Sequence, residues 1–204
     1  EAEKSLREGL EILAELSEES PRLAQVDNLK VIHANSLAEM LATAGNPGEV
    51  RELLAMAIES LLRCLEANPN DPFMAPVLKP TFARFTVHLL NEGDPVAAFE
   101  QLEKLAEQYP KSGAAAYEIA VGLCECIQAA RRDESLSMAD REVREAALAT
   151  RTVAILRRAV ELGARPPATL AADCRFASIK EHADFKDLAA SASQPQANAA
   201  IGSN

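Results

Sequence analysis

The chain has 204 residues, of which 48% are apolar and only 4% aromatic, and it contains no tryptophan. This length is enough to bury a core as one domain or one short superhelix. The formal net charge of −10 disfavours a general nucleic-acid partner, because phosphate binding depends on basic patches. No alternating runs of β-branched and aromatic residues are found, so the composition favours helix packing over a sheet.

Helical spacing of apolar residues continues through almost the whole chain. The first helix, marked by leucines at positions 6, 10, 13 and 16, is expected to end before Ser20-Pro21. The long helices that follow are expected at residues 22–44, 49–67, 73–91, 95–108, 112–132 and 137–162. Short helices are expected at 167–172 and 184–190.

Proline and glycine mark the boundaries between these helices. Asp94 is placed to cap the helix that follows it, with Pro95 in the first helical position. Gly163 is expected to end the longest helix. Pro76 and Pro80 predict an irregular start for residues 73–91, because proline lacks the N–H group and crowds the preceding turn.

The composition changes from Ser191 onward to Ser, Gln, Asn, Pro, Gly and Ala. Such a segment cannot bury enough apolar surface to offset the entropy of ordering it. We therefore divide the chain into a helical domain, residues 1–190, and a flexible polar tail or linker, residues 191–204.

Successive helices with short connections raise the question of internal repeats. The residues before Pro110 match the packing positions of a tetratricopeptide unit, with the small Thr86 and Ala98 where paired helices approach closely. The separation between Asn68-Pro69 and Tyr109-Pro110 is longer than that unit. We expect an all-α, tetratricopeptide-like helical repeat superhelix of about three antiparallel helix pairs with a short helical C-terminal cap.

The last third of the chain carries a more specific resemblance. Its motifs are Ala-Tyr-Glu-Ile-Ala at 116–120, Ala-Val-Glu-Leu-Gly at 159–163, Leu-Ala-Ala-Asp at 170–173 and Ala-Asp-Phe at 183–185. In this order they resemble the tetratricopeptide-like modules that follow the kinase domain in planctomycete serine/threonine kinases. In that family a Leu-Arg pair and Pro-Asp-Phe close the module, whereas Ile179-Lys180 and Ala183 stand at the corresponding places here. The resemblance implies that catalysis lies outside this chain.

The closing motifs predict a structural role. Asp173 and Asp184 are placed to cap short helices. An apolar set can cover the open end of the last long helix, as the terminal face of a repeat array requires, and it consists of Phe176, Ile179, Phe185 and Leu188.

Motifs of catalysis and metal binding are absent from the sequence. It has no phosphate-binding glycine loop, Gly-x-Ser-x-Gly elbow or His-Glu-x-x-His pair. Four cysteines form neither a disulfide framework nor a zinc spacing, and Cys124 and Cys126 would point about 200° apart on a helix. We expect buried, reduced thiols and neither enzymatic activity nor a metal or cofactor. The reduced thiols point to a cytoplasmic location. No apolar run reaches the roughly 20 residues of a membrane span, so we expect no membrane insertion.

Two surfaces are candidates for binding a protein or peptide. Arg144, Arg151 and Arg158 recur every seven residues on the longest helix and form a stripe. They either border the apolar face, with their heads on acids such as Asp140 and Glu161, or form a docking rail for an acidic or phosphorylated peptide.

The second candidate is the inner wall built from the first helix of each pair. By analogy with tetratricopeptide grooves, the inward residues are Ala83, Val87, Asn91, Tyr117 and Val121. Tyr117 can also be a core residue, since Ala116 and Ala120 leave it space. We expect a non-enzymatic protein-interaction or scaffold module, with the regulatory appendage of a serine/threonine kinase as its biological setting. The alternative is a small-molecule or thiol-dependent sensor that uses the helical interior, and an exposed Cys124 with a lowered pKa would favour it.

Overall fold

The structure, a computed structural model, describes residues 1–19, 24–68, 71 and 73–191. Within these residues the fold is entirely helical and no strand is present, which confirms the all-α prediction. Its α-helices are α1 (Ala2–Glu19), α2 (Ala24–Ala44), α3 (Pro47–Ala67), α4 (Ala75–Asn91), α5 (Pro95–Gln108), α6 (Gly113–Ala130), α7 (Met138–Glu161) and α8 (Ala183–Ala190). Two 3-10 turns, η1 (Pro167–Thr169) and η2 (Cys174–Phe176), lie between α7 and α8.

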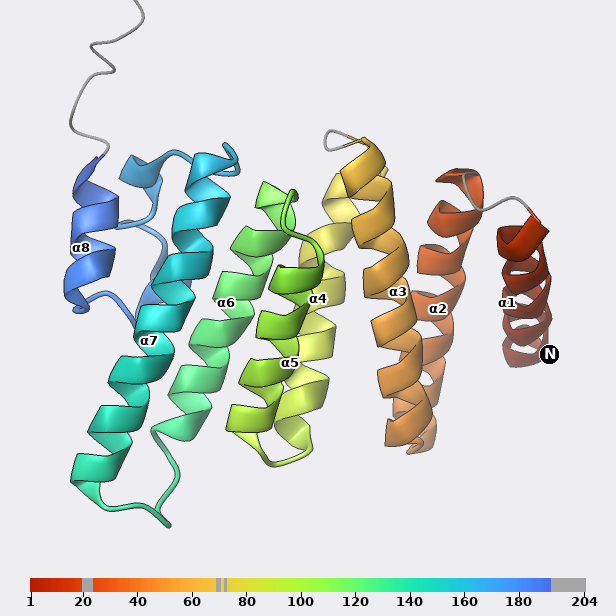
Figure 1. Cartoon of the computed structure of the whole chain (residues 1–204). Helices are drawn as coiled ribbons and strands as arrows, with labels where there is room; N and C mark the ends of the chain where they lie inside the picture. The colour runs from red at the N-terminus through yellow and green to blue at the C-terminus, as the bar shows by residue number, and fades with distance from the viewer. Residues whose placement is uncertain (20–23, 69–70, 72, 192–204) are drawn as a thin grey trace, which may run out of the picture.

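The helices follow one another in chain order across the molecule, from α1 at one end to α8 at the other, and successive long helices run in opposite directions (Figure 1). Helix α2 packs mainly on α3, while α6 contacts α4, α5, α7 and η2. Helix α6 is therefore the central element of the C-terminal half. Its buried residues cover most of its circumference, and Glu118 and Glu125 lie on the remaining, partly exposed face.

The expected irregular start of α4 is wrong. The helix begins at Ala75 and continues through Pro80. Pro76 lies in the first turn, where its missing N–H would have no helical partner, so only Pro80 disrupts the interior. That disruption costs about 3 kcal/mol, whereas burying side chains such as Phe82 and Phe85 contributes roughly 1.5–3 kcal/mol each. Burial of this face of α4 therefore offsets the destabilisation that Pro80 causes.

The predicted boundary signals at α5 and α7 are confirmed. Asp94 caps α5 by accepting from the backbone N–H groups of Val96 and Ala97, and Pro95 is its first residue. Gly163 follows the C-cap of α7, Leu162, and has a φ of 76°, which only glycine adopts readily. There the N–H of Ala164 donates to the carbonyl of Ala159 at 3.0 Å, and that of Gly163 to Val160 at 2.9 Å. These two bonds form a Schellman motif, which turns the chain back toward α6.

The C-terminal cap is built as predicted from apolar residues, with one correction. Phe176, Ile179, Phe185 and Leu188 are all buried. The Phe176 ring lies between those of Tyr117 and Phe185, with centres 5.5 and 6.0 Å away. Asp173 caps η2, as expected. Asp184 does not cap α8, because His182 occupies that position and Asp184 lies inside the first turn.

Two further predictions concern the C-terminal tail and membrane insertion. The polar tail falls almost entirely on residues 192–204, which lie outside the described part of the chain. Among the described helices, none is long and apolar enough to cross a membrane.

Candidate functional site

A groove runs between α4 and α6 and is bordered by the segment 164–175. Its two hollows adjoin, since Lys79 and Glu118 line both of them. The narrow hollow has a volume of about 70 Å³ and is lined by Lys79, Phe82, Ala83, Thr86, Glu118, Val121, Gly122, Glu125 and Arg175. The wide hollow has a volume of about 350 Å³ and is lined by Leu65, Pro76, Leu78, Lys79, Ala114, Tyr117, Glu118, Ala164 and Arg165.

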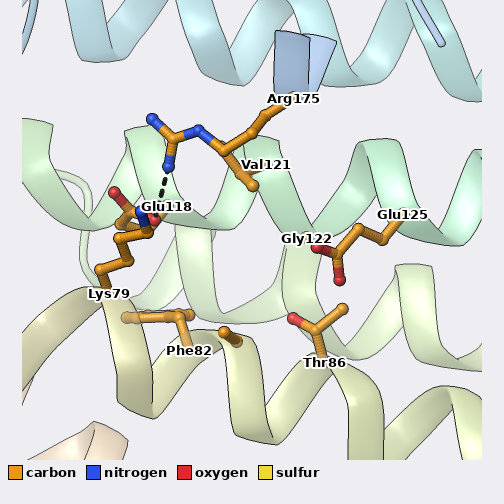
Figure 2. A pocket seen from close by; sticks show the side chains of 9 residues that line it. Lys79, Phe82, Thr86, Glu118, Val121, Gly122, Glu125 and Arg175 are labelled. Carbon is orange, nitrogen blue, oxygen red and sulfur yellow. Dashed lines mark hydrogen bonds and ion pairs between the residues drawn. The ribbon is translucent and has the colours of Figure 1, made fainter. Parts of the chain in front are cut away.

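The groove exists because α4 and α6 lie side by side in the same direction. Lys79 and Thr86 stand seven residues apart on α4, as do Glu118 and Glu125 on α6, so each pair occupies one face of its helix. Figure 2 shows the two faces opposite one another, with the two carboxylates and the threonine hydroxyl directed into the space between the helices.

The helices approach most closely at Gly122. A Cβ atom at this position would come within 2.6 Å of the Thr86 hydroxyl oxygen and 3.0 Å of a Leu102 methyl group. The absence of a side chain on α6 therefore determines how near α4 and α5 can come. Gly122 and Thr86 both line the narrow hollow, so their close approach limits its width.

Hydrogen bonds and an ion pair attach the segment 164–175, which borders the groove, to α6. The Tyr117 hydroxyl donates to Asp173 Oδ2 at 2.5 Å, and Arg175 Nη2 donates to Asp173 Oδ2 at 2.8 Å. Arg175 also donates to the Tyr117 hydroxyl at 3.0 Å and forms an ion pair with Glu118 at 3.4 Å. Figure 2 shows this last contact as the dashed line from Arg175 to Glu118. The positive charge of Arg175 is thus already compensated by two carboxylates.

Hydrogen bonding and burial shift the pKa values of the groove residues in opposite directions. The hydrogen bonds from Arg175 hold the pKa of Asp173 well below its ordinary value. Burial, together with the hydrogen bond to Asp173, raises the pKa of Tyr117 to about 12. Burial also raises the pKa of Glu118, against the lowering effect of Arg175. The pKa of Glu125 is raised by burial too. The two glutamates are therefore carboxylates for which ionisation is disfavoured in the free protein.

Three charged groups of the groove make no ion pair with any residue that the structure describes: Lys79, Arg165 and Glu125. Lys79 projects from α4 beside Glu118 (Figure 2). The Arg165 guanidinium carbon lies 5.6 Å from the centre of the Tyr117 ring. The Schellman motif at Gly163 places Arg165 there, since it directs the chain across the start of α6.

The structure brings some of the predicted wall residues together and separates others. Ala83 and Val121 line the narrow hollow, and Tyr117 lines the wide one although it is almost fully buried. Val87 and Asn91 line a different hollow, of about 380 Å³, formed with residues of α2 and α3. The predicted wall therefore spans two separate depressions.

The arginine stripe lies against its own chain. Arg144 pairs with Asp133 at 3.3 Å, and Arg151 Nε donates to Glu103 at 2.8 Å. Arg158 donates to the backbone carbonyl of Ala106. The partners differ from the Asp140 and Glu161 of the sequence prediction. Each guanidinium of the stripe thus has an intramolecular partner on α5 or on the loop before α7.

Sequence reasoning missed the charged residues of the groove. Lys79, Glu118, Glu125, Arg165 and Arg175 were not selected as candidates. The seven-residue spacing of Glu118 and Glu125 on an apolar helix is a signal that could have found them. The arginines could not be found this way, because they reach the groove only through the fold of the C-terminal cap.

Three of the four cysteines are buried. Cys64, Cys124 and Cys126 are buried as expected, whereas Cys174 is exposed. Burial raises the pKa of Cys124 and of Cys126 to about 12, so both are protonated near neutral pH. Cys124 thus lacks the exposure and the lowered pKa that a thiol-dependent sensor needs. The described residues contain no cluster of His, Cys, Asp and Glu that could hold a metal ion.

Comparison of the chain with protein-family models, with curated proteins and with solved structures gives no significant match. Function is therefore inferred from the geometry of this chain.

Proposed function

We propose that the chain is a non-enzymatic protein-interaction module and that the α4/α6 groove is its binding site. The observation that carries this proposal is the continuity of the groove. Two adjoining hollows, lined by α4, α6, the end of α3 and the segment 164–175, combine apolar walls with charged groups of which three form no ion pair with a described residue. A preformed site of this kind binds an extended segment without first having to order itself.

We further propose that the helices form a tetratricopeptide-like superhelix of three pairs, α2 with α3, α4 with α5, and α6 with α7. The antiparallel course of consecutive helices supports this pairing (Figure 1). The parallel placement of α4 and α6 also supports it, since the first helices of successive pairs line one wall of such a superhelix.

The biological setting we propose is regulatory: a cytoplasmic module attached to a serine/threonine kinase. It is supported by the order of the motifs at 116–120, 159–163, 170–173 and 183–185. Sequencing the reading frame upstream of the codon for Glu1 tests this part. A protein-kinase catalytic loop is expected there, and a long upstream frame without one would contradict the kinase setting.

The binding function is tested by selecting a displayed library of random peptides on the immobilised chain. The recovered peptides are then titrated, by fluorescence anisotropy, against a variant whose groove is filled. Ala83 is exposed and lines the narrow hollow, so Ala83→Trp blocks the groove without disturbing the core. We expect Ala83→Trp to weaken binding at least about tenfold, or by about 1.4 kcal/mol.

The matched control is Ala147→Trp, which places the same side chain on an exposed position of α7. It should bind the peptides as the wild type does. Equal binding by Ala83→Trp and Ala147→Trp would contradict the groove as the binding site. Circular dichroism of both variants verifies that each remains helical.

A further inference from the structure

We propose that the occupant of the α4/α6 groove is an extended peptide that carries a basic side chain for Glu125 and, about four residues away, an acidic side chain for Lys79 and Arg165. This inference rests on the proposed function and specifies its ligand. It depends on the separation of unpaired charges along the groove rather than on the net charge of the chain.

The narrow end of the groove fits a cation. Glu125 projects into the hollow beside the Thr86 hydroxyl, and both are hydrogen-bond acceptors for an ammonium or guanidinium group (Figure 2). Lys79 and Arg175 border the same hollow, and the charge of Arg175 is compensated by Asp173 and Glu118. Burial raises the pKa of Glu125, so an entering cation would favour the ionised carboxylate that the empty groove disfavours. A lysine or arginine side chain therefore gains a partner that the folded chain does not supply.

The wide end of the groove fits an anion next to an apolar contact. Lys79 and Arg165 both line this hollow and form no ion pair with a described residue. Glu118 lines it too and is paired with Arg175, although Lys79 and Arg165 also lie near enough to lower its pKa. Leu65 and Leu78 form part of the wall. A carboxylate of the peptide can contact the two cations while the methylene groups beside it pack on the leucines.

The length of the groove determines the spacing of the two peptide charges. Tyr117, at the wide end, and Glu125, at the narrow end, are separated by eight residues of α6, which at about 1.5 Å per residue correspond to about 12 Å. An extended peptide advances about 3.3 Å per residue, so about four residues cover this distance. The side chains between them face Phe82 and Val121, which favours small or apolar residues there.

The test begins with the sequences that the random peptide library yields on the wild-type chain. We expect enrichment of peptides in which Lys or Arg and Asp or Glu stand about four positions apart. The same library is then selected on Glu125→Lys. We expect these peptides to exchange the basic residue for an acidic one and to retain the acidic residue that contacts Lys79 and Arg165.

Neutral variants give the quantitative measurement. Glu125→Gln should weaken the wild-type-selected peptides at least about tenfold, because it leaves the peptide cation without its carboxylate. Arg165→Gln should weaken binding of these peptides by a similar factor, because it removes a cation that contacts the acidic side chain of the peptide in the wide hollow. Each loss should disappear for a peptide in which the matching charge is replaced by alanine. The controls are Glu142→Gln and Arg157→Gln, both at exposed positions of α7.

The outcomes separate this inference from the proposed function. Peptides that lose binding to Ala83→Trp but bind Glu125→Gln and Arg165→Gln like the wild type would overturn the charge pattern and leave the groove as the site. Selection of the same peptides by the wild type and Glu125→Lys would overturn it as well. Enrichment of no peptide, or binding insensitive to Ala83→Trp, would overturn both proposals.

Discussion

Gly122 of α6 faces Thr86 of α4 so closely that a Cβ atom on the glycine would lie 2.6 Å from the threonine hydroxyl oxygen. Contacts this short do not occur between a methyl group and an oxygen, so a side chain at position 122 requires either the Thr86 side chain or the helices to shift. The same contact lies at the floor of the groove. Packing of the core and width of the candidate site therefore depend on one residue.

Gly122→Ala is expected to lower the free energy of unfolding by about 1–2 kcal/mol. Overpacking costs typically 1–3 kcal/mol, and the higher helix propensity of alanine returns up to about 1 kcal/mol. Denaturant unfolding measures the change. Thr86→Ala removes the obstructing oxygen, so it should reduce the penalty when combined with Gly122→Ala.

The control for this prediction is Gly48→Ala in α3, where an added Cβ atom would meet nothing within 4 Å. This change should leave the unfolding free energy unchanged or raise it slightly. A Gly122→Ala protein as stable as Gly48→Ala would show that α4 and α6 have room to adjust, and would remove Gly122 as the determinant of groove width.

Phe185→Ala is expected to cost about 3–5 kcal/mol of stability, because the ring is buried beside Phe176 and its loss leaves a cavity. The measurement is again the free energy of unfolding in denaturant. Phe73→Ala provides a control of the same chemistry, since Phe73 is 74% exposed and its loss should change stability by less than about 0.5 kcal/mol. A Phe185→Ala cost below about 1 kcal/mol would mean that α8 is peripheral to the core.

The lowered pKa of Asp173 predicts a pH dependence of stability. Its folded-state pKa lies below the unfolded value of about 3.9, so the stabilisation is fully present above that pH and is lost as the pH falls toward the folded-state pKa. Asp173→Asn should therefore be less stable than the wild type near neutral pH. The difference between the two proteins should shrink as the pH falls below about 4.

Chemical denaturation of both proteins between about pH 3 and 7 checks this, with Asp187→Asn on the exposed surface of α8 as the control. Comparison with the wild type cancels the contributions of other titrating groups, including Glu118, whose raised pKa acts with the opposite sign. A difference that stays constant through acid pH would show that the bonds from Arg175 and Tyr117 do not stabilise the ionised carboxylate.

The sequence predicts those parts of the structure that depend on local signals. Asp94 with Pro95 and Gly163 define helix boundaries through contacts within one turn, so their roles could be read directly. Pro80 was misread because its cost is offset by tertiary burial of α4, which no local pattern contains. The sequence allows only part of the groove to be predicted. Its two walls follow from helical spacing, but the ion pair between Arg175 and Glu118 depends on how the C-terminal cap folds back onto α6.

The heptad arginines show the same limit and provide the last prediction. Their spacing is visible in the sequence, but their partners on α5 and in the loop before α7 are not. The Arg151 guanidinium donates to Glu103 and lies 4.8 Å from the centre of the Phe99 ring. Arg151→Ala should therefore lower stability by about 0.5–2 kcal/mol, from an ion pair worth up to about 1 kcal/mol and a cation–π contact worth about 0.5–1 kcal/mol.

A double-mutant cycle of Arg151→Ala with Glu103→Ala isolates the ion pair, and Arg151→Lys retains the charge but loses the planar stacking on Phe99. Arg157→Ala, exposed on the same helix, should change stability by less than about 0.5 kcal/mol. Because each arginine of the stripe already has an intramolecular partner, the Arg151→Ala variant should bind the groove peptides like the wild type. A variant of unchanged stability that binds those peptides more weakly would instead identify the stripe as part of the docking surface.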